Sequence, residues 1–113
     1  MRLLLYGADP VDVVREALVD APGLDAAFVF GSVARGTAEP DSDLDLFLVG
    51  TREEQKRATR LLGEAGYFIS RPVDVIGRES EQFTRAEESF LQRIHAVPKI
   101  WVHESDETLT RAA

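Results

Sequence analysis

Residues 30–46 read FGSVARGTAEPDSDLDL and combine a glycine–serine turn with aspartates at alternate positions. An apolar run, AAFVF, leads into the turn at 26–30, and a second run, LDLFLV, covers 44–49. Both runs have the length and the aromatic and branched composition of β-strands. Side chains alternate between the faces of a strand, so Asp43 and Asp45 are expected to project from the same face, one pleat apart.

The pair Asp43 and Asp45 predicts a divalent cation. Two carboxylates this close repel each other by about 1 kcal/mol in water and by several times more near a protein surface. Hard oxygen ligands at this spacing suit Mg²⁺ or Mn²⁺, which bind few carboxylates together with phosphates and waters. Gly31 and Ser32 stand where the first strand turns, and their N–H groups and hydroxyl are expected to hold a phosphate. Such a combination is typical of phosphoryl or nucleotidyl transfer.

Helical and extended signals alternate along the rest of the chain, which favours an α/β or α+β fold. Asp9-Pro10 and the apolar spacing after it predict a helix over 10–20, and Thr51 with Glu54 matches a capping box that opens a helix over 51–66. We expect further strands at 72–76 and in KIWV at 99–102, with one or two helices between 83 and 94.

Length and composition limit the possible functions. A chain of 113 residues has room for one modest core, so we expect a single domain over 1–113. Thirteen Lys and Arg against twenty Asp and Glu give a net charge of −7, which argues against direct nucleic-acid binding. Cysteine is absent, which excludes disulfides and zinc–thiolate sites. No apolar run approaches the roughly 20 residues of a membrane span, and the N-terminus is too quickly polar for a signal peptide, so a cytoplasmic location is expected.

Two other motifs fit the same residues poorly. GSVARGT at 31–37 has the glycine spacing of a Walker A loop, but the lysine required after the second glycine is missing. Asp41, Asp43 and Asp45 imitate the first ligands of a calcium loop. That loop needs glycine where this chain has Leu46 and glutamate where it has Arg52, so neither motif explains the stretch.

The run GSVARGTAEPDSDLDL resembles the signature of the DNA polymerase β-like nucleotidyltransferase superfamily, in its minimal nucleotidyltransferase branch. The signature is Gly-Ser, ten intervening residues and Asp-x-Asp, and here the ten are Val33 to Ser42. The resemblance covers Ala26 to Ile76, and FLQRIHAVPKIWV is more loosely similar to the tail of domains found behind winged-helix regulators. It implies an α+β fold of the polymerase β type, with a small mixed sheet of about four strands and helices packed on one face.

The resemblance also implies the roles of the site residues. Asp74, in the third expected strand, would join Asp43 and Asp45 as a catalytic and metal-binding carboxylate and would help to deprotonate the attacking hydroxyl. The phosphates of a nucleoside triphosphate would be bound by Gly31, Ser32 and Arg35. The implied reaction is a Mg²⁺-dependent transfer of a nucleoside monophosphate, AMP from ATP, to a hydroxyl acceptor.

Partner proteins are a further implication of the resemblance. Some minimal nucleotidyltransferases are antitoxins that adenylylate a cognate toxin, so a protein partner is expected to supply or to be the acceptor. A homodimer is also open, because the apolar C-terminal strand could pair at an exposed edge. The alternative function is a catalytically silent module that binds a nucleotide or a partner; three metal-site aspartates favour the enzyme.

Each of these residues also has a purely structural interpretation. Asp43 and Asp45 could form the polar start of a strand, and Ser32 could cap a helix. Asp74 could occupy an exposed edge strand. Arg35 could be a surface cation paired with Glu39 or Asp41. His95 and His103 show no ligand spacing, and Trp101 is expected in the core.

Overall fold

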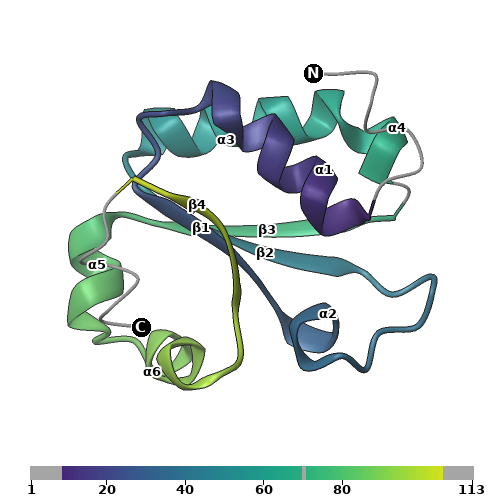
Figure 1. Ribbon diagram of the computed structural model, residues 1–113. Helices are drawn as coiled ribbons and strands as arrows, with labels where there is room; N and C mark the ends of the chain where they lie inside the picture. The colour runs from purple at the N-terminus through teal and green to yellow at the C-terminus, as the bar shows by residue number, and fades with distance from the viewer. Residues whose placement is uncertain (1–8, 70, 106–113) are drawn as a thin grey trace.

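The computed structural model describes residues 9–69 and 71–105, and its elements alternate along the chain as the sequence predicts (Figure 1). The elements in chain order are α1 (Pro10–Ala17), the 3₁₀ turn η2 (Leu18–Asp20), β1 (Ala26–Phe30), α2 (Gly31–Arg35), β2 (Leu44–Val49), α3 (Arg52–Glu64), α4 (Gly66–Ile69), β3 (Val73–Arg78), α5 (Ser80–Arg85), α6 (Ser89–Ala96) and β4 (Ile100–Glu104).

The four strands form one mixed sheet in the order β3-β2-β1-β4. β1 lies in the middle and pairs antiparallel with both β2 and β4, whereas β3 runs parallel to β2. The parallel pair requires a crossover, and α3 with α4 supplies it. The expected mixed sheet of four strands is therefore confirmed, with β3 and β4 at its two edges.

Helices cover both faces of this sheet, which differs from the expected single helical layer (Figure 1). On one face Leu46 and Leu48 of β2 pack with α1, α3 and α4. On the other, Phe28 and Phe47 stack with ring centroids 5.0 Å apart, and Phe83 of α5 packs against both rings. The physical reason is that β1 and β2 are apolar on both faces, so each face must be kept from water.

The ends of several elements differ from the expectation by a few residues. The first helix is α-helical only to Ala17 and closes in the 3₁₀ turn η2; its predicted cap is present, with Val11 N donating to Asp9 Oδ1 at 2.8 Å. At the start of α3, Glu54 N donates to Thr51 Oγ1 at 3.2 Å. The expected helix over 51–66 is divided, because α3 stops at Glu64 and α4 begins at Gly66.

The aromatic and imidazole side chains outside the site have structural contacts. Trp101 is half-buried and packs edge-on against Phe28, with centroids 4.9 Å apart. His95 stacks on Phe83 and its Nε2 lies 2.7 Å from the carbonyl oxygen of Phe83. His103 Nε2 lies 2.9 Å from the carbonyl oxygen of Leu24.

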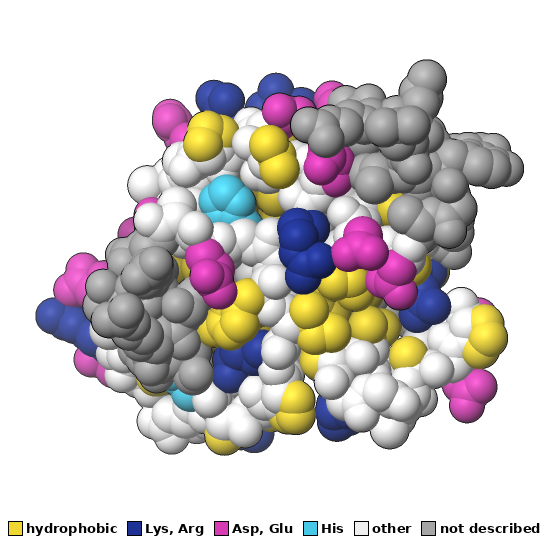
Figure 2. All heavy atoms as spheres, viewed as in Figure 1, with side chains coloured by type: hydrophobic (Ala, Val, Ile, Leu, Met, Phe, Trp, Pro, Cys, Tyr) yellow, Lys and Arg dark blue, Asp and Glu magenta, His cyan; other side chains and the backbone are white. Residues whose placement is uncertain are grey.

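Acidic and basic side chains are interspersed on the face shown in Figure 2. Within the described ranges, none of the helices is long and apolar enough to cross a membrane.

Candidate active site

The turn after β1 and the start of β2 are linked by a loop that backbone and side-chain hydrogen bonds hold in place. Gly36 ends α2 in the left-handed conformation (φ +76°), and Thr37 N donates to the carbonyl of Ser32 at 3.0 Å. Farther along, Glu39 N donates to Ser42 Oγ at 2.8 Å, and Ser42 N donates to the carbonyl of Glu39 at 3.0 Å. These bonds define the path of the chain into Asp43 and β2.

Asp45 and Asp74 are direct neighbours on the parallel strands β2 and β3. Paired residues of adjacent strands project from the same face, so the two carboxylates lie side by side. Across the other side of β2, Asp45 is paired with Phe30, the last residue before the Gly31 turn. Asp43 precedes β2 by one residue, two positions from Asp45. The sheet therefore brings the three aspartates together next to the glycine–serine turn.

Gly31 is in close contact with the carboxylate of Asp45. Its backbone is left-handed (φ +72°), a conformation that side chains with a Cβ adopt only at a cost. A Cβ atom at this position would also overlap Oδ2 of Asp45. Two separate reasons therefore favour glycine here: the left-handed backbone and the closeness of Asp45. The second reason depends directly on the position of the Asp45 carboxylate.

The three aspartates also interact electrostatically. Burial raises the pKa of the Asp45 carboxyl, and the charges of Asp74 and Asp43 raise this pKa further. Arg35 acts in the opposite direction and lowers the pKa of Asp45. The positive charge of Arg35 only partly offsets the negative charge of the two neighbouring aspartates, so a bound cation would relieve the remaining repulsion at Asp45.

The donor set suits a hard divalent cation. Asp43 and Asp74 are exposed and Asp45 is half-buried, so carboxylate oxygens are accessible from solvent. In residues 9–69 and 71–105, however, no group of three or more Asp, Glu or His side chains is arranged to hold a metal ion as it stands. Mg²⁺ often binds through only one or two carboxylates and takes its other ligands from substrate phosphates and water, which matches an open arrangement of this kind.

Ser32 and Arg35 both lie on α2. Phe30 occupies the N-cap position of α2, so Ser32 is inside the helix and is not its cap. Arg35 is exposed, and none of the ion pairs in the described part of the chain joins it to Glu39 or Asp41. Its positive charge is close enough to Asp45 to lower the pKa of that carboxyl.

Sequence reasoning missed Arg71 as a residue that positions the loop. Its Nη1 donates to the carbonyl of Ser42 at 3.2 Å, across 29 positions of sequence, and so ties the segment before β3 to the segment before β2. Arg71 thereby helps to align Asp43 with Asp74. No local signal marks it, because the contact exists only after the two strands have paired.

Comparison with known proteins gives one family and several similar folds. A family model described as a nucleotidyltransferase domain matches residues 11–98. No curated protein matches the chain significantly.

Three solved structures have similar folds. A toxin–antitoxin crystal structure with AMP-PNP has a TM-score of 0.61 at 17% identity, over 91% of this chain and 80% of the other. The toxin–antitoxin MntA-HpeT, in a form with two aspartates replaced by glutamate, has a TM-score of 0.61 at 15% identity over the same shares. A protein proposed to be a minimal nucleotidyltransferase has a TM-score of 0.53 at 26% identity, over 80% of this chain and 86% of the other.

Proposed function

Because this chain belongs to the nucleotidyltransferase domain family, we propose that it is a Mg²⁺-dependent enzyme that transfers AMP from ATP to a hydroxyl group of a partner protein. The observation that carries the proposal is the pairing of Asp45 with Asp74 beside the Gly31 turn. A repelling carboxylate pair next to a turn in which any Cβ would overlap one of the two carboxylates is costly for a structural purpose alone. It is useful where a cation and a phosphate chain must bind.

Each residue has a separate task in this reaction. Asp43 and Asp45 would hold Mg²⁺, which would supply positive charge to the triphosphate and favour attack at the α-phosphorus. Ser32 and the backbone at Gly31 bind the phosphates that leave, and Arg35 adds positive charge there. Asp74 accepts the proton of the attacking hydroxyl as the new oxygen–phosphorus bond forms. The bond from the α-phosphorus to the bridging oxygen breaks at the same time, and pyrophosphate departs.

Two of the similar structures support the choice of nucleotide and partner. One toxin–antitoxin was solved with AMP-PNP, an analogue of ATP. In MntA-HpeT the replaced aspartates are two positions apart, the same separation as Asp43 and Asp45.

The test of this function is transfer of label from ATP to the protein that co-purifies with the chain in its native host. Label at the α-phosphate should appear on the acceptor and label at the γ-phosphate should not, because the γ-phosphate leaves in pyrophosphate. Asp45→Asn should lower the rate by about 1,000-fold. Asp41→Asn is the matched control, since Asp41 lies in the exposed turn of the same acidic run and should leave the rate unchanged.

Asp74→Asn separates proton transfer from binding. If Asp74 accepts the proton, this variant should bind Mg²⁺-ATP with nearly the parent affinity in calorimetry and still lose transfer. Equal transfer by the parent chain and by Asp45→Asn would refute the enzymatic function. Binding of Mg²⁺-ATP without transfer to any partner would favour a nucleotide-binding module.

A further inference from the structure

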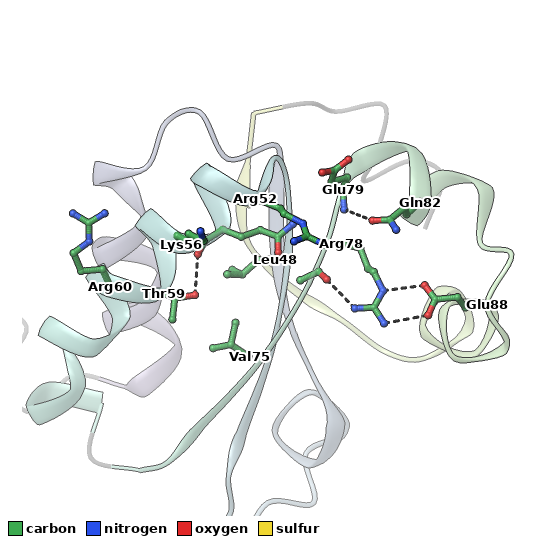
Figure 3. Close-up of a pocket in the computed structure, with 12 residues that line it drawn as sticks. Leu48, Arg52, Lys56, Thr59, Arg60, Val75, Arg78, Glu79, Gln82 and Glu88 are labelled. Atoms are coloured by element: carbon green, nitrogen blue, oxygen red, sulfur yellow. Dashed lines mark hydrogen bonds and ion pairs between the residues drawn. The ribbon is translucent and has the colours of Figure 1, made fainter.

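A groove of about 930 Å³ lies between α3, the C-terminal half of β3 and the α5–α6 segment (Figure 3). Leu48 and Val75 form its apolar floor, and α3 borders one side. Val75 follows Asp74 in β3, and consecutive side chains of a strand project from opposite faces. The apolar floor and the α3 side of the groove therefore lie on the α3 face of the sheet, and the three aspartates lie on the other; the α5–α6 side of the groove lies beyond the edge of β3.

Three cations of α3 border this groove at positions i, i+4 and i+8: Arg52, Lys56 and Arg60. Residues at this spacing are neighbours on a helix surface, so their like charges repel. Within the described ranges none of the three has an acidic partner. Their neighbour Arg57 lies 3.9 Å from Glu54, and Arg78 makes a bidentate pair with Glu88 at 2.9 and 3.2 Å. On a chain of net charge −7, this exposed basic row is available to attract an external anion.

The adjoining strand β3 is an edge of the sheet. Leu44 N donates to the carbonyl of Pro72 at 2.8 Å and Gly50 N to the carbonyl of Arg78 at 3.1 Å, so the even-numbered residues of β3 bond to β2. The peptide groups of Val73 and Val75 consequently face away from β2. At Gly77 the outward carbonyl accepts a hydrogen bond from Arg78 Nη1 at 2.8 Å, so an added strand can pair with this edge at Val73 and Val75.

We propose that this groove binds an extended, acidic segment of a partner protein, which pairs with the open edge of β3 and places its carboxylates against the basic row of α3. The spacings agree: four residues of a helix rise about 6 Å, and two residues of a strand about 6.6 Å. Alternate acidic side chains of one extended segment therefore meet successive cations of the row. The apolar floor at Leu48 and Val75 accepts alkyl parts of the same segment.

A nucleic acid fits this groove less well than a peptide. Glu79 and Glu88 also line the groove and repel any anion, whether carboxylate or phosphate, so they do not decide between the two. The strand edge does, because a nucleic acid cannot form a β-ladder with the outward peptide groups of Val73 and Val75. Binding of the segment needs no nucleotide, because the basic row and the apolar floor lie on the face of the sheet opposite the aspartates, and only the backbone of the segment passes beside Asp74.

The test is a titration of the ¹⁵N-labelled chain, without nucleotide, with a peptide of about ten residues that alternates glutamate and valine. The amide signals of 73–77 and of 52–60 should shift together. Lys56→Glu should weaken binding by about tenfold. Arg57→Glu, the next residue of the same helix with the same change of charge, should weaken it by less than about twofold, because Arg57 does not line the groove.

Two altered peptides and one RNA complete the experiment. Lysine in place of glutamate should abolish binding if the basic row is responsible, and N-methylation of alternate amides should abolish it if β3 accepts a strand. The proposal would be overturned if either altered peptide bound as tightly as the original peptide. It would also be overturned if Lys56→Glu and Arg57→Glu weakened binding equally, or if the amide shifts were confined to other elements. Tighter binding of single-stranded oligouridylate in this groove would overturn it as well.

Discussion

Replacing Gly31 by alanine tests whether the turn exists to accommodate Asp45. Gly36 is a matched control, because both glycines have a left-handed backbone (φ +72° and +76°) and both belong to the α2 segment. They differ in one respect: a Cβ at position 31 would overlap Oδ2 of Asp45, whereas a Cβ at position 36 would meet no described atom within 4 Å.

The magnitudes follow from these two geometries. Gly36→Ala adds only backbone strain, about 1 to 2 kcal/mol. Gly31→Ala adds the same strain and also displaces the Asp45 side chain from its rotamer, for about 0.5 to 1.5 kcal/mol more. In an Asp45→Ala background the extra cost should disappear, and Gly31→Ala should then cost what Gly36→Ala costs.

Urea unfolding followed by the fluorescence of Trp101, the single tryptophan, measures these differences. Calorimetry with Mg²⁺-ATP provides the functional measurement: Gly31→Ala should lose binding by about 100-fold because it moves Asp45, while Gly36→Ala keeps most of its affinity. The reasoning is refuted if Gly31→Ala costs the same stability with and without Asp45, or if both glycine variants bind nucleotide equally.

Three further predictions concern stability and the loop. Asp45→Asn should stabilise the metal-free protein at pH 7, because the pKa of Asp45 is raised in the folded state and its ionisation therefore opposes folding. This advantage should vanish as the pH falls toward 3.8, the ordinary pKa of an aspartate. Urea midpoints across pH check this, and an advantage that grows on acidification would contradict it. Phe83→Ala should lower the free energy of unfolding by about 3 to 5 kcal/mol, because the ring is 0% exposed. Val19→Ala, at a position that is 62% exposed, should lower it hardly at all. Equal urea midpoints for the two variants would contradict this. Arg71→Ala should free the loop at Ser42 and weaken Mg²⁺-ATP binding in calorimetry with little loss of stability, and unchanged affinity would show that the 3.2 Å bond has no part in the site.

The strand–turn–strand unit around residues 30–46 was predictable because its signals are local. Gly31 and Gly50 end the apolar runs, and alternation places Asp43 and Asp45 on one face. The register of Asp74 against Asp45 is not local, since it depends on the crossover through α3, and only the resemblance to a family implied it.

Features that depend on packing between distant segments were missed or misjudged. The second helical layer was not expected, because α5 and α6 are short and their apolar faces are identified only by contact with Phe28 and Phe47. Nothing in the sequence around Arg71 indicates that its side chain donates a hydrogen bond to the carbonyl of Ser42. The row of cations on α3 has a visible helical spacing, but only the three-dimensional structure shows that no acidic side chain of residues 9–69 and 71–105 pairs with it.

The sheet separates the aspartates on one face from the basic row of α3 on the other, and this arrangement has a consequence for divergence among duplicated genes. Under the two proposals made above, substitutions at exposed positions of α3 should change the preferred partner protein without altering nucleotidyl transfer. Substitutions around α2 should alter nucleotide binding while the preference for the partner stays the same. Choice of partner and nucleotide chemistry would then be open to separate selection or engineering.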